Sequence, residues 1–334
     1  MILLAADVGG TNTRLLLAEY SGKDRMTLYE KNYPSHQYNN FYDVVTLFLE
    51  ESNVKDSLDV ACIAVAGPVI NAEASITNLP WIISEEILKK HLHIESVKLI
   101  NDFSAISYGI SELNKDDIEV LQQGDLVSRP TPSAVIIGAG TGLGVSHRVW
   151  INDHYHVFPS EAGHTTFAPQ DVLQSQLLMY LFKKYNYVSL ESILSGRGFL
   201  VLYHFLKDEL LIPESTKVKQ QLSNEDPAQV ITQAALNNTD LLCEKTVELY
   251  IKIYGAAVGN AALYYYPVDE VYIAGGIAPK LKTLLKSKSF ISALTNKGLM
   301  SENMKKLTLK LITQDKVGLL GALEYSRAYA ECRQ

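Results

Sequence analysis

The chain has 334 residues, a net charge of -7 and 47% hydrophobic residues, which is the composition of a globular protein with room for two domains. The acidic balance argues against wholesale nucleic-acid binding, which requires a basic face. The three scattered cysteines form neither a disulfide framework nor a C-x-x-C metal motif and indicate a reducing cytosol. No apolar run is long enough to cross a membrane. The first apolar run is interrupted by Asp7 and lacks the basic flank of a signal peptide.

The chain opens with a glycine turn between two predicted strands. An apolar run up to Val8 predicts a buried strand, and Leu15 to Ala18 begins a second apolar run without a helix cap. Gly9 and Gly10 lie between them, free to take positive φ angles in a tight turn. The order strand, turn, strand differs from Rossmann and P-loop sites, in which a helix follows the glycine loop.

This first turn has the features of a phosphate-binding concavity. The backbone N–H groups of residues 9–12 would face the phosphate oxygens, and Thr11, Asn12 and Thr13 would add side-chain donors. Asp7 puts a carboxylate where phosphate should bind, which makes sense if Mg²⁺ lies between them and is held through water. A plain β-hairpin with a Gly-Gly turn is the structural alternative, and this stretch alone does not decide between the two.

Two polar residues follow the next informative strand. Residues 97–100 predict a short strand that ends in Asn101 and Asp102, and an apolar helix follows from Phe103 to Ile110. The carboxyl ends of strands are where α/β sheets bind their ligands. Asp102 can equally be the N-cap of the helix, and both interpretations stay open here.

The opening pattern returns in the middle of the chain. Ala134 to Ile137 predicts a strand, residues 138–144 a glycine turn, and Val145 to Ile151 another strand. Two such units indicate an internal duplication of one α/β unit, with the ligand held between the halves. Because Thr11 and Thr141 lie in the two turns, the pair is interpreted as two clamps on one polyphosphate.

A predicted loop from Phe158 to His164 presents Glu161 and His164 three residues apart. No second His or Cys lies nearby, so the pair suits hydrogen bonds to a polar ligand better than a metal ion. A surface loop without function is the alternative.

The next stretch, residues 189–196, predicts a short helix that Ser189 caps and Gly196 ends, with Glu191 in its first turn. A polar surface excursion is expected from Lys217 to Pro227.

The last glycine motif, Gly275-Gly276, follows a predicted strand over residues 271–274. It would let a flat base or ribose approach the backbone, and a plain strand-to-helix turn is the alternative. Periodicity also predicts strands over residues 59–66 and 307–312, and helices over 40–51, 84–91, 171–185, 199–210, 226–236, 241–265, 280–287 and 318–330.

Taken together, five motifs resemble the family of bacterial glucokinases of the hexokinase type. They are Asp7-Val8-Gly9-Gly10-Thr11-Asn12, Ile100-Asn101-Asp102-Phe103, Gly138-Ala139-Gly140-Thr141-Gly142-Leu143-Gly144, Glu161-Ala162-Gly163-His164 and Ala274-Gly275-Gly276-Ile277. They occur in the order of that family and cover the chain from end to end. The related sugar kinases and repressors with a cysteine-rich zinc motif match less well, because no such cluster is present.

The resemblance implies an α/β protein with the two-domain actin-like ATPase (ribonuclease H-like) fold and an interdomain cleft. Residues 1–109 and 317–334 would form a small domain, and residues 110–316 a large one. It also implies a cytoplasmic homodimer that phosphorylates the 6-hydroxyl of glucose with Mg·ATP. Neither nucleic acid nor membrane is an expected partner.

The family's functional residues are carried over motif by motif. Asp102 matches the catalytic base. The residues that match glucose ligands are Asn101, Asp102, Glu161, His164 and Glu191. The positions that match the Mg·ATP site are Asp7, through water to Mg²⁺, and Val8, Gly9, Gly10, Thr11, Asn12, Gly138, Gly140, Thr141, Gly142, Gly275 and Gly276. Residues 64–68, Asn78 and Trp81 also resemble the family pattern around the sugar.

Three other functions stay open at this point. A kinase for another hexose or an amino sugar would differ in its relative rates across sugars. A sugar-sensing regulator that lost the chemistry is disfavoured by Asp102 and by both glycine turns. An actin-like or chaperone-like ATPase would hydrolyse ATP strongly without sugar.

Overall fold

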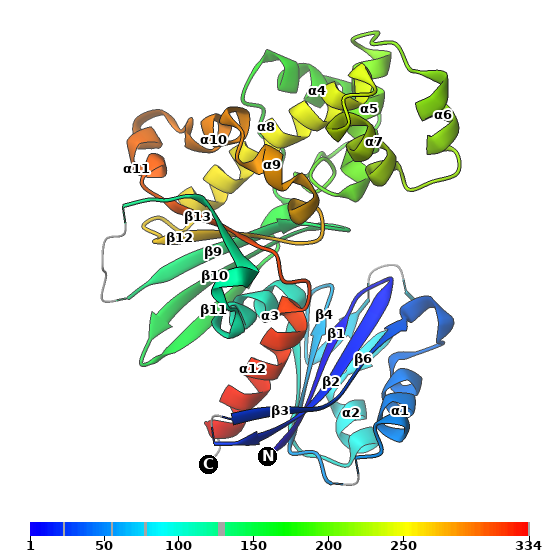
Figure 1. The fold of residues 1–334 in the computed structure, drawn as a ribbon, viewed down its shortest axis with the longest axis vertical. Coiled ribbons are helices and arrows are strands. Elements are labelled where there is room, and N and C mark those ends of the chain that lie inside the picture. Colours follow the sequence, from blue (N-terminus) through cyan, green and yellow to red (C-terminus); the bar gives the residue numbers. More distant parts are fainter. Residues whose placement is uncertain (23, 55, 77–78, 126–130, 333–334) are drawn as a thin grey trace. The chain divides into compact units, whose positions relative to one another are not determined.

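The computed structural model describes residues 1–334 except 23, 55, 77–78, 126–130 and 333–334 (Figure 1). Asn78, one of the residues carried over from the family, therefore lies outside the described residues. The contacts divide the chain into two units. One comprises residues 1–117, 157–159 and 314–334, and the other comprises residues 118–156 and 160–313.

The first unit is built on a five-stranded sheet with the strand order β3-β2-β1-β4-β7. β1 is antiparallel to β2 and parallel to β4, and β4 is parallel to β7. Val8 lies opposite Val65, and Val65 lies opposite Asn101, so the carboxyl ends of β1, β4 and β7 form one edge. The strands are β1 (Ile2–Val8), β2 (Asn12–Ser21), β3 (Asp24–Pro34), β4 (Val60–Val65) and β7 (Val97–Asn101), with a separate ribbon of β5 (Glu73–Ser75) and β6 (Ile82–Ser84).

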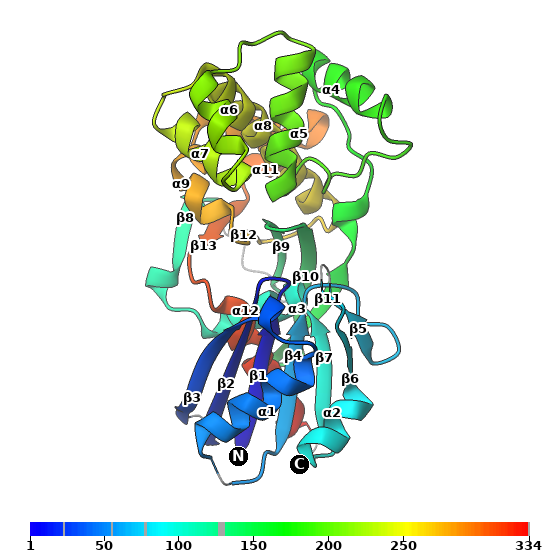
Figure 2. The same cartoon turned by 90° about the vertical axis from the view of Figure 1, so that its right-hand side faces the viewer.

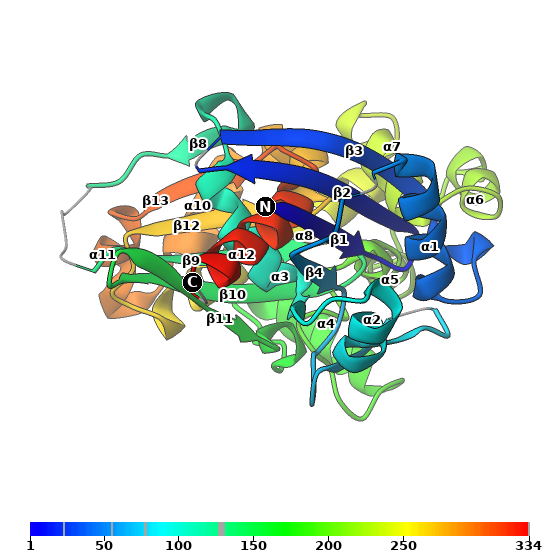
Figure 3. The same ribbon diagram turned by 90° about the horizontal axis from the view of Figure 1, so that it is seen from below.

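Helices cover both faces of this sheet, because alternate side chains of a strand point to opposite faces. Leu4 and Ala6 of β1 belong to a core that includes residues of α1 (Phe41–Ser52) and α2 (Glu85–Leu92), which lie on one face (Figure 2). Leu3 and Ala5 pack on the other face with residues of α3 (Asp102–Gly109) and α12 (Val317–Glu331) (Figure 3).

The backbones of α3 and α12 come into direct contact at two glycines. A Cβ atom built on Gly321 would lie 1.6 Å from the carbonyl oxygen of Ala105, and one on Gly109 would lie 2.0 Å from the carbonyl oxygen of Val317. Only glycine fits at such a close approach, so these two positions fix the distance between the helices.

The second unit repeats the sheet arrangement of the first. Its six-stranded sheet has the order β11-β10-β9-β12-β13-β8. β9 is antiparallel to β10 and parallel to β12, and β12 is parallel to β13. The repeated sequence pattern thus corresponds to a repeated topology. The strands are β8 (Ile118–Gln122), β9 (Ser133–Ala139), β10 (Leu143–Ile151), β11 (His154–Ser160), β12 (Glu270–Ala274) and β13 (Thr308–Ile312).

Helix α8 (Leu241–Tyr264) is the central helix of the second unit, and α5, α7 and α10 pack against it (Figure 1). The other helices are α4 (Val172–Phe182), α5 (Gly196–Asp208), α6 (Thr216–Leu222), α7 (Pro227–Leu236), α9 (Lys282–Leu285), α10 (Lys288–Thr295) and α11 (Ser301–Lys305). Short 3-10 turns cover residues 35–37, 110–112, 115–117, 162–164, 278–281 and 298–300. Among the residues that the structure describes, no helix combines the length and the apolar character needed to cross a membrane.

The predicted helix over residues 189–196 is wrong. Ser189 pairs with Thr166 in a β-bridge, residues 190–194 form a turn in which the N–H of Leu194 donates to the carbonyl oxygen of Leu190 at 2.9 Å, and Gly196 begins α5. The N–H groups of Leu190 and Glu191 donate to the carbonyl oxygens of Thr165 and Gly163, so pairing with the neighbouring segment takes the place of helical hydrogen bonds. The N–H of Gly196 donates instead to the carbonyl oxygen of Gly140 at 2.9 Å, which fixes the start of α5.

Two predicted irregular segments contain regular structure. The polar stretch from residue 217 to 227 includes most of α6, whose N-cap Ser215 accepts from the N–H of Val218 and donates to Asp240 at 2.6 Å. Residues 158–160 end β11 and are not part of a loop. Polar composition hid the helix in the first case, and proline with small residues hid the strand in the second.

The packing of α10 on α8 buries part of a lysine. A Cβ atom on Gly259 of α8 would lie 2.3 Å from the carbonyl oxygen of Leu294, so the helices meet closely. Lys297 follows α10, and its ammonium group donates to the carbonyl oxygen of Ala256 at 3.0 Å and to Oδ1 of Asn260 at 2.7 Å. Burial lowers the pKa of Lys297 from 10.5 to about 8.

We expect Lys297 to make the folded chain more stable as pH rises from about 8 to 10.5. Over that window the unfolded chain holds the lysine proton and the folded chain has released it, so the unfolded state binds more protons and stability increases with pH. Urea unfolding of the wild type and Lys297→Met, at neutral pH and near pH 10, measures this effect as a change in their stability difference in favour of the wild type. A difference that stays constant with pH would contradict it.

Candidate active site

The first glycine hairpin connects β1 to β2 through residues 9–11. The N–H of Gly9 donates to the carbonyl oxygen of Asn12 at 2.9 Å. Thr11 and Asn12 are exposed, so their side chains can reach a ligand. The side chain of Val8 is fully buried and cannot contact a ligand. Its carbonyl oxygen accepts from the N–H of Ala66 at 3.1 Å.

Two expectations for this hairpin are wrong. Gly9 and Gly10 do not adopt positive φ angles; the described glycines that do are Gly22, Gly67, Gly275 and Gly298. Thr13 is fully buried, and its hydroxyl is 3.0 Å from the hydroxyl of Ser35, so it supports the hairpin and does not face a ligand.

Ser35 supports the first hairpin through two hydrogen bonds to its backbone. Its hydroxyl donates to the carbonyl oxygen of Gly9 at 2.8 Å, and its backbone N–H donates to the carbonyl oxygen of Thr11 at 2.9 Å. Ser35 is fully buried. It was not identified from the sequence, because it is separated from the hairpin by two strands and no local motif surrounds it.

If the first hairpin holds the phosphates of ATP, as the resemblance to the glucokinase family implies, Ser35→Ala should raise the KM for ATP about fivefold, because roughly 1 kcal/mol of hydrogen bonding that shapes the hairpin is lost. Steady-state kinetics at saturating glucose measures it. Ser326→Ala is the matched control, since Ser326 is equally buried and donates to the carbonyl oxygen of Ala322 within α12. Equal KM values in the two variants would exclude a supporting role for Ser35.

The carboxylate of Asp7 is partly buried in the first unit. Burial raises its pKa, and the guanidinium of Arg14, opposite on β2, lowers it in part. A Cβ atom on Gly318 would lie 3.2 Å from Oδ2 of Asp7, so the start of α12 packs directly against this carboxylate. No group of three or more His, Cys, Asp or Glu that could hold a metal exists among the described residues. A single carboxylate fits a Mg²⁺ ion that is delivered with phosphate oxygens and water.

Asn101 and Asp102 lie where β7 meets α3. Asn101 is the N-cap, and its Oδ1 accepts from the N–H groups of Phe103 at 2.9 Å and Ser104 at 3.3 Å. Its Nδ2 donates to the carbonyl oxygen of Gly67 at 3.2 Å. Asp102 is the first helical residue, so the N-cap interpretation applies to Asn101. The carboxylate of Asp102 therefore lies in the first turn of α3.

Trp81 belongs to the core of the first unit. It is 1% exposed, packs near Phe41, and its indole N–H donates to the carbonyl oxygen of Tyr38 at 3.2 Å. Its side chain therefore stabilises the fold of this unit and does not offer a surface to a ligand.

The second glycine hairpin is formed by residues 140–142, because the flanking residues belong to β9 and β10. The N–H of Gly140 donates to the carbonyl oxygen of Gly142 at 2.8 Å. Gly138 lies within β9, where a Cβ atom would be 2.4 Å from the carbonyl oxygen of Ala274. Gly138 is therefore required for strand packing, and the open space beside Gly140 and the exposed Thr141 are available to a ligand.

Gly275 and Gly276 lie beside this second hairpin, at the carboxyl edge of the sheet. Gly275 has a φ of 83°, and a Cβ atom on it would lie 2.5 Å from the carbonyl oxygen of Ala139. The N–H of Ile277 donates to the same oxygen at 3.3 Å. Nothing lies within 4 Å of a Cβ atom built on Gly276, so its backbone is open to a ligand.

The three polar side chains of the second unit also lie near this hairpin. Oε2 of Glu161 is 3.9 Å from Nε2 of His164, and both side chains are about 60% exposed. The N–H of Glu191 donates to the carbonyl oxygen of Gly163 at 2.9 Å, and its carboxylate accepts from the N–H of Leu143 at 2.9 Å. The second unit thus brings Glu161, His164 and Glu191 together, whereas Asn101 and Asp102 belong to the first unit.

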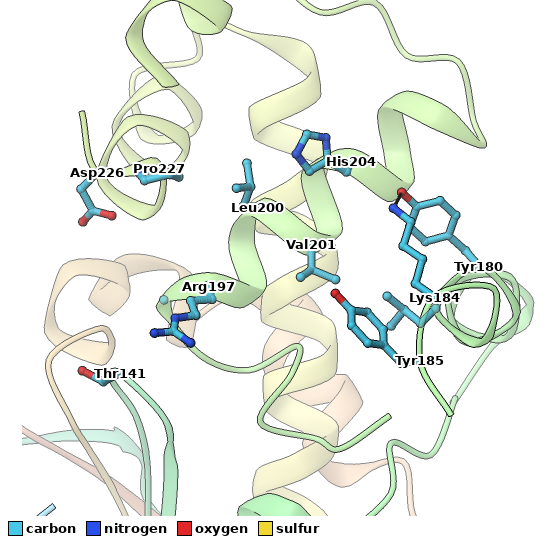
Figure 4. A pocket seen from close by; sticks show the side chains of 12 residues that line it. Thr141, Tyr180, Lys184, Tyr185, Arg197, Leu200, Val201, His204, Asp226 and Pro227 are labelled. Atoms are coloured by element: carbon cyan, nitrogen blue, oxygen red, sulfur yellow. Dashed lines mark hydrogen bonds between the residues drawn. The ribbon is translucent and has the colours of Figure 1, made fainter. Parts of the chain in front are cut away.

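A pocket of about 540 Å³ begins at Thr141 and extends along α5 between α4 and the start of α7 (Figure 4). Tyr185, Leu200 and Val201 give it an apolar and aromatic wall, and Arg197 adds a cation near Thr141. Sequence reasoning did not find this pocket, because its walls come from three helices whose residues form no common motif.

The comparisons with known proteins agree along the whole chain. The Glucokinase family model matches residues 4–329. A glucokinase from a Nostoc species is 40% identical over 335 residues, which covers 96% of this chain and 97% of that protein.

Solved structures share the fold. The glucokinase from an Antarctic psychrotroph has a TM-score of 0.82 at 28% identity and covers 98% of this chain and 99% of its own. A ROK family glucokinase from Streptomyces griseus, solved with glucose and AMPPNP, has a TM-score of 0.62 at 16% identity and covers 98% and 100%. The fold is therefore the two-domain actin-like ATPase fold, and the chain belongs to the glucokinase family.

Proposed function

We propose that this chain transfers the γ-phosphoryl group of ATP to the 6-hydroxyl of glucose, with Asp102 as the general base. The observation that carries the proposal is the place of Asp102, at the carboxyl edge of the sheet from which the first glycine hairpin also projects. Ligands of open α/β sheets bind at this edge. Membership of the glucokinase family supports the same reaction.

The two glycine hairpins hold the phosphates in this proposal. Their free N–H groups and the hydroxyls of Thr11 and Thr141 donate to phosphate oxygens. Gly275 and Gly276 bring open backbone beside the second hairpin, and the pocket that starts at Thr141 accommodates the nucleoside. Bound Mg²⁺ would neutralise charge on the phosphates, and Asp7 would hold it through water. The Streptomyces griseus relative, solved with AMPPNP, supports a nucleotide substrate.

Glucose is held through its hydroxyls by Asn101, Asp102, Glu161, His164 and Glu191. Carboxylates accept from vicinal hydroxyls, and the amide and imidazole groups donate to hydroxyl oxygens. The exposure of Glu161 and His164 fits side chains that await a polar ligand. A sugar that lacks or inverts one hydroxyl leaves a protein group unpaired, which costs about 1–3 kcal/mol.

The reaction itself requires positioning and one proton acceptor. The bond between O6 of glucose and the γ-phosphorus forms, while the bond between that phosphorus and the bridging oxygen of ADP breaks. The O6 proton moves to the carboxylate of Asp102 as the new bond forms, and ADP leaves with the bonding electrons. A positioned base of this kind contributes about 10²- to 10⁴-fold in rate. We further propose that the chain works as a cytoplasmic homodimer, as its resemblance to the family implies.

A rate panel tests the choice of sugar. We expect kcat/KM for glucose to exceed the values for mannose, fructose and N-acetylated amino sugars by at least tenfold, the effect of about 1.4 kcal/mol from one mismatched hydroxyl. A higher value for a different sugar would replace glucose as the substrate and leave the phosphoryl transfer in place.

A further inference from the structure

The carboxylate of Glu191 is joined to the second glycine hairpin. Oε2 accepts from the N–H of Leu143, the residue directly after the turn, at 2.9 Å. A Cβ atom on Gly142 would lie 2.4 Å from the same oxygen, so this carboxylate rests against the hairpin backbone itself. One oxygen of Glu191 is therefore committed to the hairpin, and Oε1 is the oxygen left for a ligand.

Two further contacts join the second glycine hairpin to the start of α5 and to the loop that contains Glu161 and His164. The N–H of Gly196 donates to the carbonyl oxygen of Gly140 at 2.9 Å, on the opposite side of the turn from Leu143. A Cβ atom on Gly163 would lie 2.0 Å from the carbonyl oxygen of Leu143, so the loop that contains Glu161 and His164 is in backbone contact with the hairpin. Glu191 links these parts, because its own N–H donates to the carbonyl oxygen of Gly163 at 2.9 Å.

We infer that Glu191 is a positioning residue that couples the sugar site to the nucleotide site by holding the second glycine hairpin through the N–H of Leu143. The inference rests on the proposed function, in which this hairpin holds the phosphates of ATP. A hydroxyl that binds Oε1 also fixes the carboxylate, and the fixed carboxylate orders the hairpin for the phosphates. By linkage, glucose then strengthens nucleotide binding by the same factor by which the nucleotide strengthens glucose binding.

The contact explains why glycine stands at position 142. A side chain there would displace the Glu191 carboxylate from Leu143. The contact with the hairpin also distinguishes Glu191 from Glu161, whose carboxylate lies 3.9 Å from the imidazole of His164. The two glutamates share the proposed task of holding sugar hydroxyls, and Glu191 has the additional task at the hairpin. This difference supplies a matched pair of variants.

Binding of Mg·AMPPNP to the sugar-free protein tests the inference by calorimetry, with Glu191→Ala, Glu191→Gln and Glu161→Ala compared with the wild type. We expect the Kd to rise about tenfold in Glu191→Ala, because a hydrogen bond to a charged acceptor is lost. In Glu191→Gln the amide oxygen still accepts from Leu143, so the rise is about threefold. In Glu161→Ala the Kd stays within about twofold of the wild type, although glucose binds more weakly in all three variants.

A second measurement, the Kd for Mg·AMPPNP in the presence of glucose, distinguishes coupling between the sugar and nucleotide sites from a folding defect. We expect saturating glucose to lower the Kd for Mg·AMPPNP in the wild type. The ratio of the Kd without glucose to the Kd with glucose should fall to about one in Glu191→Ala and be partly restored in Glu191→Gln. Sugar-free Kd values in Glu191→Ala that match the wild type would overturn the inference and leave the proposed function intact. A wild-type protein that binds no Mg·AMPPNP at all would overturn both.

Discussion

Asp102→Asn is expected to lower kcat for glucose phosphorylation by about 10²-fold or more, the range for loss of a positioned general base. The fold at this position should persist, because Oδ1 of Asp102 accepts from the N–H of Phe103 at 2.9 Å and an asparagine oxygen can accept the same bond. Binding of glucose should change by no more than a few fold, since the amide still forms hydrogen bonds. Kinetics and glucose binding measured on the same preparation separate the two effects.

The control for this variant is Asp43→Asn, which makes the same change in the first turn of α1. Asp43 is exposed and accepts from the side-chain amide of Asn40 at 2.8 Å, outside the candidate site. We expect its kcat to equal that of the wild type. If Asp102→Asn retained more than about a tenth of the wild-type kcat, Asp102 would not be the general base.

Gly321→Ala is expected to destabilise the first unit by about 3 kcal/mol or more, at the upper end of the cost of overpacking a core. The added methyl carbon would lie 1.6 Å from the carbonyl oxygen of Ala105, and 2.7 Å from the backbone nitrogen of Gly109. Both neighbours are backbone atoms, so the contact can be relieved only if α3 and α12 move apart. Since α3 begins at Asp102, the displacement should also lower kcat in the molecules that remain folded.

Thermal and urea unfolding measure this effect, with Gly276→Ala as the control for the same chemical change. Nothing lies within 4 Å of a Cβ atom at position 276, and its φ angle is not in the left-handed region. We expect that variant to unfold within about 1 kcal/mol of the wild type. A similar result for Gly321→Ala would show that the helices tolerate separation at this crossing.

Sequence reasoning predicted most of the elements that carry the candidate site, because those elements are strongly periodic. Both strand–turn–strand units formed, with turns at residues 9–11 and 140–142; the second turn is shorter than the predicted 138–144, because β9 extends to Ala139 and β10 begins at Leu143. α1, α7, α8 and α12 formed within two residues of their predicted ends. Alternation of apolar residues in strands and their helical spacing are local signals, so they can be found without a structure.

The contacts that hold the two glycine hairpins in place could not be predicted from local sequence patterns. Ser35 reaches Gly9 across two strands, and Glu191 reaches Leu143 across 48 residues, so no local pattern encodes either contact. The motifs also did not reveal what each glycine does. Gly9 and Gly10 were expected to be free to take positive φ angles, whereas the glycines that have them include Gly67 and Gly275. Gly138 is required for packing between strands.

The most direct test of the central claim is to follow ATP, ADP and sugar phosphate by phosphorus NMR, with wild-type protein, Mg²⁺ and glucose, beside a sample without sugar. We predict formation of glucose 6-phosphate and ADP in equal amounts, with little hydrolysis of ATP when glucose is absent. Glucose binding without any loss of ATP would contradict the account and indicate a sugar sensor. Rapid release of inorganic phosphate without sugar would contradict it as well and indicate an ATPase of the same fold.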